Sequence, residues 1–190
     1  MRTSWPRRAP AAVLVAALIA GCAGGGSSNA PPRAYDLGTE APAARMPALE
    51  LREVRALRPY DGSAMYYRLA YQDGAELAVY AQSRWVAPPA ELLRKQLARA
   101  TRPGTPRCTL DVELQEFTQV FSAAHSSTAR LELVATLGTP GAHRESLALR
   151  LSEEDAGSTA ARGASALQRV VARAIADLAA WIDGVAACRG

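Results

Sequence analysis

The sequence predicts an α+β fold, a mostly antiparallel sheet with two amphipathic helices packed on one face. Several short segments alternate apolar and polar residues, which is typical of half-buried strands. Two other segments repeat apolar residues at spacings of three and four, which is typical of helices with one buried face. Their order along the chain is strands, helix, three strands, helix, and this order favours a two-layer α+β domain.

The first expected strands lie before residue 88. Leu49 and Leu51 begin one short strand. Residues 65–71 alternate in the same way, and the alternation resumes at 77–79 after a turn at Asp73-Gly74. Two alternating segments joined by an Asp-Gly turn predict a β-hairpin.

The first expected helix follows Pro88-Pro89, because proline interrupts strand pairing and is tolerated in the first turn of a helix. Its apolar face comprises Leu92, Leu93, Leu97 and Ala100. Arg102-Pro103-Gly104 ends it.

Three further strands and a closing helix complete the domain. Residues 110–114, 131–137 and 147–151 alternate and predict an antiparallel meander. Residues 152–162 are polar and small, so we expect a loop there. The apolar stripe of the closing helix is Ala164, Leu167, Val171, Ala174, Leu178, Trp181 and Val185.

Composition and charge exclude one class of function. Hydrophobic residues make up 49% of the 190 residues, which is ample for one core. The net charge is +4, but three of the 22 basic residues lie within the first eight positions. Without them, 19 basic residues face 18 acidic ones, and no basic cluster is visible. We therefore expect no nucleic-acid partner.

Residues 1–21 predict a lipoprotein signal peptide. Basic residues come first, and an apolar run of ten residues, 11–20, follows. This run is too short to span a membrane. Ile19-Ala20-Gly21-Cys22 resembles the bacterial lipobox, which makes Cys22 the expected site of lipidation. The alternative is an ordinary secretory signal with a chance cysteine.

The residues after Cys22 predict a tethered, periplasmic domain. Three acyl chains on one cysteine make a permanent membrane anchor. Ala23 stands where Asp commonly retains lipoproteins in the inner membrane, so we expect an outer-membrane location facing the periplasm. Residues 22–34 have the composition of a flexible linker, and 35–190 form a single domain.

Cys108 and Cys188 remain once Cys22 is lipidated. In an oxidising compartment such a pair predicts a disulfide. The bond would close a loop of about 80 residues and hold the closing helix against the sheet. Two free thiols are the alternative. Two cysteines without a nearby histidine are a poor metal site, so we expect neither metal nor cofactor.

No credible active site is visible. His125 and His143 fall in expected loops, and no Gly-x-Ser-x-Gly nucleophile motif accompanies them. The acidic run 153–155 lacks the ligand spacing of a calcium loop and fits a solvated loop. We therefore expect a protein that is not an enzyme.

The segment 76–97, ELAVYAQSRWVAPPAELLRKQL, is the most specific in the chain. It resembles the ABC-type transport auxiliary lipoproteins (PqiC-like), in which a strand ending in Arg-Trp precedes a proline-containing turn and an amphipathic helix. The residues that match this pattern are Arg84, Trp85, Pro88 and Pro89. The resemblance also takes in Tyr35-Asp36-Leu37, 110–121 and the end of the closing helix.

The resemblance implies an auxiliary subunit of an MCE-type ABC system that moves lipids between the two membranes. Its expected partners are an MCE-domain periplasmic protein with its permease and ATPase, and a homo-oligomer is conceivable. The alternative is an assembly lipoprotein for an outer-membrane barrel or lipopolysaccharide translocon. A periplasmic hydrolase is disfavoured by the missing nucleophile motif.

Trp85 has two interpretations. A tryptophan between a strand and a Pro-Pro turn can pack beneath the helix and bury a large apolar area. It can also lie on the surface as a partner-binding residue, because tryptophan and arginine are enriched at such positions. Tyr66, Tyr71 and Tyr80 fit either an interface or cross-strand packing.

Overall fold

The computed structural model describes residues 1, 31–141, 143–155 and 157–189. The expected signal peptide, Cys22 and nearly all of the linker lie outside the described residues, so lipidation at Cys22 stays a prediction. The chain divides into two units, and Pro32–Gly190 is the compact domain. Within the described residues, no helix is both long enough and apolar enough to cross a membrane.

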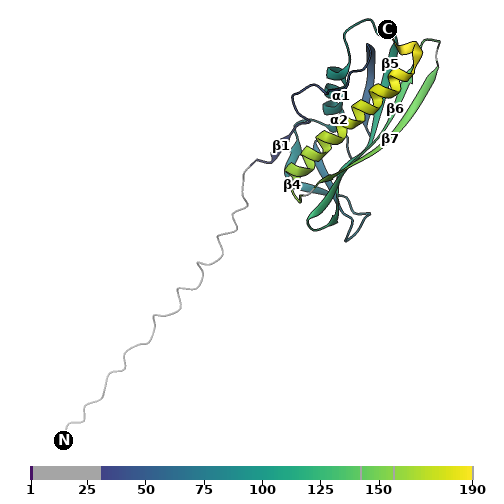
Figure 1. Ribbon diagram of the computed structural model, residues 1–190. Coiled ribbons are helices and arrows are strands. Elements are labelled where there is room, and N and C mark those ends of the chain that lie inside the picture. The colour runs from purple at the N-terminus through teal and green to yellow at the C-terminus, as the bar shows by residue number, and fades with distance from the viewer. Residues whose placement is uncertain (2–30, 142, 156, 190) are drawn as a thin grey trace. The chain divides into compact units, whose positions relative to one another are not determined.

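The domain is an α+β fold in which a seven-stranded sheet carries two α-helices (Figure 1). The strands are β1 (Arg33–Tyr35), β2 (Leu49–Ala56), β3 (Ala64–Leu69), β4 (Ala78–Trp85), β5 (Cys108–Ala123), β6 (Ser126–Gly138) and β7 (Arg144–Asp155). The helices are α1 (Pro89–Ala100), α2 (Ala160–Gly184) and the short 3-10 helix η1 (Ala186–Cys188).

The sheet is mixed, which corrects the expectation of a mostly antiparallel one. The β3–β4 hairpin and the β5–β6–β7 meander are antiparallel, as the sequence predicts. The pairs β1–β4, β2–β5 and β3–β5 are parallel. The reason lies in β5, whose 16 residues pair with β2 along the first half of one edge and with β3 along the second half.

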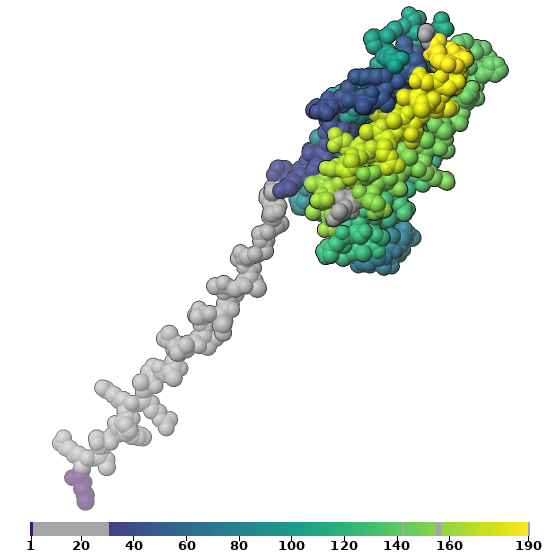
Figure 2. Space-filling model, in the orientation of Figure 1, coloured from purple at the N-terminus to yellow at the C-terminus, as the bar shows by residue number. Residues whose placement is uncertain are grey.

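Both helices cover the same face of the sheet, as the sequence predicts (Figure 1). The buried positions of α2 include the alanines, leucines and valine of the expected stripe from Ala164 to Leu178, whereas Trp181 and Val185 are half-buried. Figure 2 shows the segment that follows β1 lying along the side of α2. The main hydrophobic core therefore lies between the helices and the sheet.

The prediction of a loop at 152–162 is mostly wrong. Strand β7 continues to Asp155, and α2 begins at Ala160 after Thr159, whose side-chain oxygen accepts a hydrogen bond from the backbone of Arg162. Glu153 stays in the strand because it pairs with β6 and binds Arg169 and Arg173 of α2, at 3.0 and 2.9 Å. The acidic run is therefore the end of a strand, where helix arginines balance the charge of Glu153.

A disulfide between Cys108 and Cys188 joins the start of β5 to η1. Their Cα atoms lie 5.5 Å apart, and 80 residues separate them in sequence. Both cysteines are buried. A covalent link over this distance fixes the end of α2 to the sheet, and loop-closure estimates give it a stabilisation of roughly 4 kcal/mol.

Candidate functional site at the tether junction

The residues that carry the family resemblance meet where the expected tether reaches the domain. Strand β1 pairs in parallel with the end of β4, so that Tyr35 lies opposite Trp85. The backbone N–H of Val86 donates to the carbonyl of Tyr35 at 2.9 Å. Two segments that are fifty residues apart in sequence, the β1 end and the Arg-Trp end of β4, thus form one edge of the sheet. We call this region, with the start of α1, the tether junction.

The side chain of Trp85 connects the tether junction to the hydrophobic core. Its side chain is 1% exposed, and its ring centroid lies 5.2 Å from that of Phe117 on β5. A buried tryptophan of this kind contributes through apolar area and ring packing. The packing interpretation of Trp85 is therefore supported, and Arg84 is the exposed member of the pair, with no ion pair or hydrogen bond among the described residues.

Pro88 and Pro89 turn the chain from β4 into α1. Pro89 is buried and occupies the first turn of the helix, where its missing N–H costs no hydrogen bond. The carbonyl of Pro88 accepts the first helical bonds, from Glu91 at 2.9 Å and Leu92 at 3.2 Å. The proline pair therefore starts α1 immediately beside β1.

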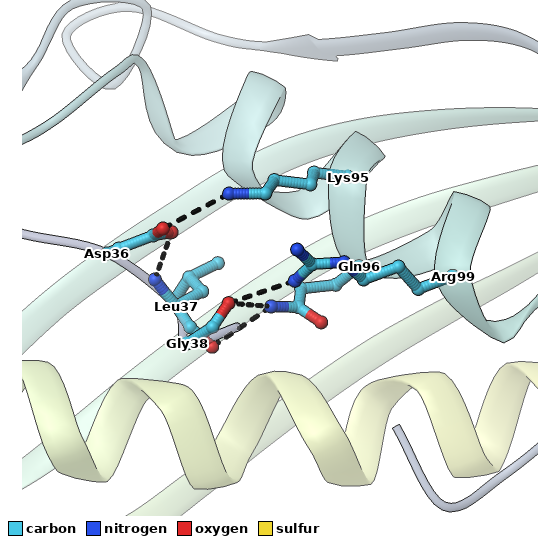
Figure 3. Close-up of polar contacts among 6 residues, drawn as sticks. All are labelled: Asp36, Leu37, Gly38, Lys95, Gln96 and Arg99. Carbon is cyan, nitrogen blue, oxygen red and sulfur yellow. Dashed lines mark hydrogen bonds and ion pairs between the residues drawn. The ribbon is translucent and has the colours of Figure 1, made fainter. Parts of the chain in front are cut away.

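Helix α1 holds the residues after β1 through three polar side chains (Figure 3). Gln96 donates from Nε2 to the carbonyls of Leu37 and Gly38, at 3.0 and 2.9 Å. Arg99 donates to the same Gly38 carbonyl at 3.0 Å. Lys95 pairs with Asp36 at 3.2 Å, and the other carboxylate oxygen of Asp36 accepts from the backbone of Leu37. This polar clamp fixes residues 36–38 on the helix.

Gly38 is the point at which α1 and α2 both approach the clamped segment. Its φ of +95° lies in the left-handed region that favours glycine. A Cβ atom there would collide with Nε2 of Gln168 on α2. A cleft of about 280 Å³ lies beside it, lined by residues that include Leu37, Pro42, Gln96, Val171 and Ile175.

The sequence predicts the members of the junction but not the clamp. The sequence does mark Gln96 as unusual, because it is a polar residue on the buried face of α1 beside Leu97. The sequence gives no indication that Asp36 pairs with Lys95, since 59 residues separate them.

Other candidate residues lie elsewhere. His125 and His143 are exposed in loops. The described residues contain no group of three or more His, Cys, Asp or Glu side chains that could hold a metal ion. Of the tyrosines, Tyr71 is 45% exposed, whereas Tyr80 packs against Tyr67 and donates to Gln119 at 2.9 Å. Tyr66 packs edge-on against the buried Tyr60.

The face of the sheet away from the helices is lined by ion pairs. Arg52 on β2 binds Asp111 on β5, and its hydrogen bond is the main cause of a lowered pKa at Asp111. The same contact raises the pKa of Arg52. On the helix side of the sheet, Arg169 and Arg173 of α2 lower the pKa of Glu153. Burial raises the pKa of Tyr60, and the nearby charge of Glu116 adds to this effect. Asp111 and Glu153 are therefore paired structural groups, because each is bound by arginine.

Comparison with known proteins shows a shared fold. A protein of Xanthomonas campestris from the DUF330 family matches over 75% of this chain and 92% of its own, with a TM-score of 0.62 and 19% identity. An uncharacterized protein matches over 80% and 99%, with a TM-score of 0.65 and 15% identity. A Caulobacter crescentus protein, described only as a candidate lipoprotein, covers 50% and 83% at 22% identity, and its TM-score of 0.35 is too low to carry an argument.

No protein-family profile and no curated protein matches the chain. DUF330 is the family of the PqiC-like lipoproteins that the sequence resembles. At identities below 20% these two structural matches show the fold alone. The fold is therefore one that a DUF330 protein also has.

Proposed function

We propose that this chain is an outer-membrane lipoprotein and the non-enzymatic auxiliary subunit of an MCE-type ABC system that moves lipid between the two membranes. In this role Cys22 carries the anchor, and the domain of residues 32–190 docks the MCE-domain protein. The lipid anchor and the docking both follow from the resemblance and the signal sequence. The domain itself supplies a rigid binding surface.

The observation that carries the proposal is the tether junction. Tyr35, Arg84, Trp85, Pro88 and Pro89, which carry the resemblance, form one structural unit rather than scattered matches. The clamp fixes residues 36–38 to α1, next to the point where the expected tether joins the domain. A tethered protein needs such a fixed attachment at this point. The DUF330 fold match supports the same family.

The test is a crosslinking pull-down of the tagged chain from its own envelope, with partners identified by mass spectrometry. Recovery of an MCE-domain protein with its permease is the expected result. The matched control is Cys22→Ser, which retains the folded domain but removes the acylated thiol, and we expect it to lose outer-membrane fractionation. Recovery of a β-barrel protein alone would contradict the transport role and support the assembly alternative.

A further inference from the structure

The end of the domain opposite the tether junction concentrates positive charge. The disulfide joins two cysteines that each have an arginine beside them, Arg107-Cys108 and Cys188-Arg189. Because their Cα atoms lie 5.5 Å apart, the bond holds the two arginines close together. Arg107 donates to the carbonyl of Arg189 at 3.3 Å, so these two residues are in direct contact.

Two more basic side chains share this region. A surface cavity of about 290 Å³ is lined by Arg107, His143 and Arg144, together with the hydroxyl-bearing Thr109 and Thr139. We call Arg107, His143, Arg144 and Arg189 the basic end. All four are exposed. The cavity brings Arg107, which precedes β5, beside Arg144, the first residue of β7.

The arginines of the basic end make no ion pair among the described residues. Asp111 is held by Arg52 in a two-contact pair, and Arg144 acts on it only through the longer-range effect of its charge. Glu50, opposite Thr109 on β2, and Glu145, next to Arg144 on β7, are exposed and remain competing negative charges. Arginine keeps its charge at every physiological pH, so the basic end is a permanent positive surface.

We propose that the basic end is the surface that docks an acidic face of the periplasmic partner protein. This inference rests on the proposed function and names the surface and the charge by which the partner is recognised. Fixed like charges on an exposed surface attract a complementary partner and orient its approach. Arginine is also the cation best suited to interface carboxylates, because its planar group can bind them with two hydrogen bonds.

The position of the basic end favours a protein over a lipid headgroup. Helix α2 runs from near the tether junction to the disulfide (Figure 1), and its 25 residues span about 37 Å. When the tether junction faces the anchoring membrane, the basic end at the opposite end of α2 points into the periplasm, where a periplasmic partner protein can reach it.

The experiment places a photo-crosslinking amino acid in the full-length lipoprotein and activates it in the native envelope. One variant carries it at Ala187, beside the basic end, and a second carries it at Ala34 on β1; both positions are exposed. We expect a protein adduct at Ala187 that contains the MCE-domain protein and a far weaker one at Ala34.

Charge reversal then tests the basis of docking. Arg107→Glu with Arg189→Glu should lower the Ala187 adduct by about tenfold or more, because it turns attraction into repulsion. Arg144→Glu, which does not flank either cysteine, should lower it in the same direction and guards against misfolding of the first variant. Arg58→Glu with Arg130→Glu makes the same change in net charge elsewhere, and we expect it to leave the adduct unchanged.

Four outcomes would overturn the inference: no adduct at Ala187, a lipid adduct there, equal protein adducts at both positions, or an adduct that both basic-end variants leave intact. An MCE-domain adduct at Ala34 alone would overturn the docking surface but support the proposed function. An arginine-dependent adduct at Ala187 with a different protein would support the surface and overturn the transport role.

Discussion

The two ends of the domain are stabilised in different ways. At the tether junction, non-covalent contacts dominate: the buried Trp85 packs on Phe117, and Gln96 donates to two backbone carbonyls. At the opposite end, one covalent bond joins Cys108 to Cys188. Both ends belong to the same buried cluster, but only the far end adds a covalent link, which requires an oxidising compartment.

This difference suits the two proposed roles. A tethered domain needs a junction that stays folded whenever the chain is folded, and core packing provides this. A docking surface needs side chains that remain exposed yet fixed, and a disulfide fixes Arg107 and Arg189 without burying them. The predictions below test each end against the other.

The largest effect is expected for Trp85→Ala. Truncating a fully buried tryptophan typically costs about 3–5 kcal/mol, from lost apolar burial and the cavity that remains. Urea unfolding of the domain of residues 32–190, followed by circular dichroism, measures the change. The control is Val86→Ala, whose side chain is 51% exposed and should alter the free energy of unfolding by less than about 0.5 kcal/mol. Equal, small effects for both variants would show that the junction is not part of the core.

Removing the disulfide should have the next largest effect. The variant Cys108→Ser with Cys188→Ser frees a loop of 80 residues, and chain-entropy estimates put the loss at roughly 4 kcal/mol. Thermal unfolding measures it, and reduction of the unmutated domain by a thiol reagent is the matched control. Hydrogen exchange should show faster opening near residues 178–188 than at the tether junction. Uniformly faster exchange would mean that the two ends are not held independently.

Gln96→Ala tests the polar clamp. The variant leaves the carbonyls of Leu37 and Gly38 with fewer partners, and a buried unsatisfied group costs about 1–3 kcal/mol. Gln168→Ala on the facing side of α2 is the control, because Gln168 is exposed and we expect a change below about 0.5 kcal/mol. Chemical unfolding of both variants separates the two effects. A neutral Gln96→Ala would mean that Arg99 alone holds Gly38.

Much of the fold could be predicted because side-chain pattern reports burial. Leucine alternation in β5, β6 and β7 and the 3–4 spacing in α2 record which side faces the core. Alternation does not record strand direction, since a strand buries every second residue whichever way its neighbour runs. The parallel pairing of β2 and β3 with β5 therefore could not be predicted in this way.

The same limit applies to the candidate site, where local features could be predicted and long-range contacts could not. Trp85 and the proline pair could be predicted because their local order implies a strand, a turn and a helix. The clamp could not, because Asp36 and Lys95 meet only after the whole β1–α1 region has folded. The basic end could not be predicted from the sequence either, since Arg107 and Arg189 are 82 residues apart and become neighbours through the disulfide.

The smallest expected effect is on the pH dependence of folding stability. Arg52 lowers the pKa of Asp111, mainly through its hydrogen bond, so the ionised carboxylate stabilises the folded state above the unfolded pKa of about 3.9. That contribution is lost as the pH falls through the lower folded pKa. Because Arg52 is half exposed, we expect it to be below about 1 kcal/mol.

Urea unfolding of Asp111→Asn between pH 6 and pH 3 measures this contribution, and the variant should lose less stability on acidification than the unmutated domain. Gln96→Ala should keep the full acid dependence, because the clamp residue it removes is an uncharged amide. If Asp111→Asn and the unmutated domain lose stability in parallel, the Arg52 contact does not stabilise the ionised carboxylate. A steeper loss in Asp111→Asn would reverse the sign of the argument and place the acid-sensitive groups elsewhere on the sheet.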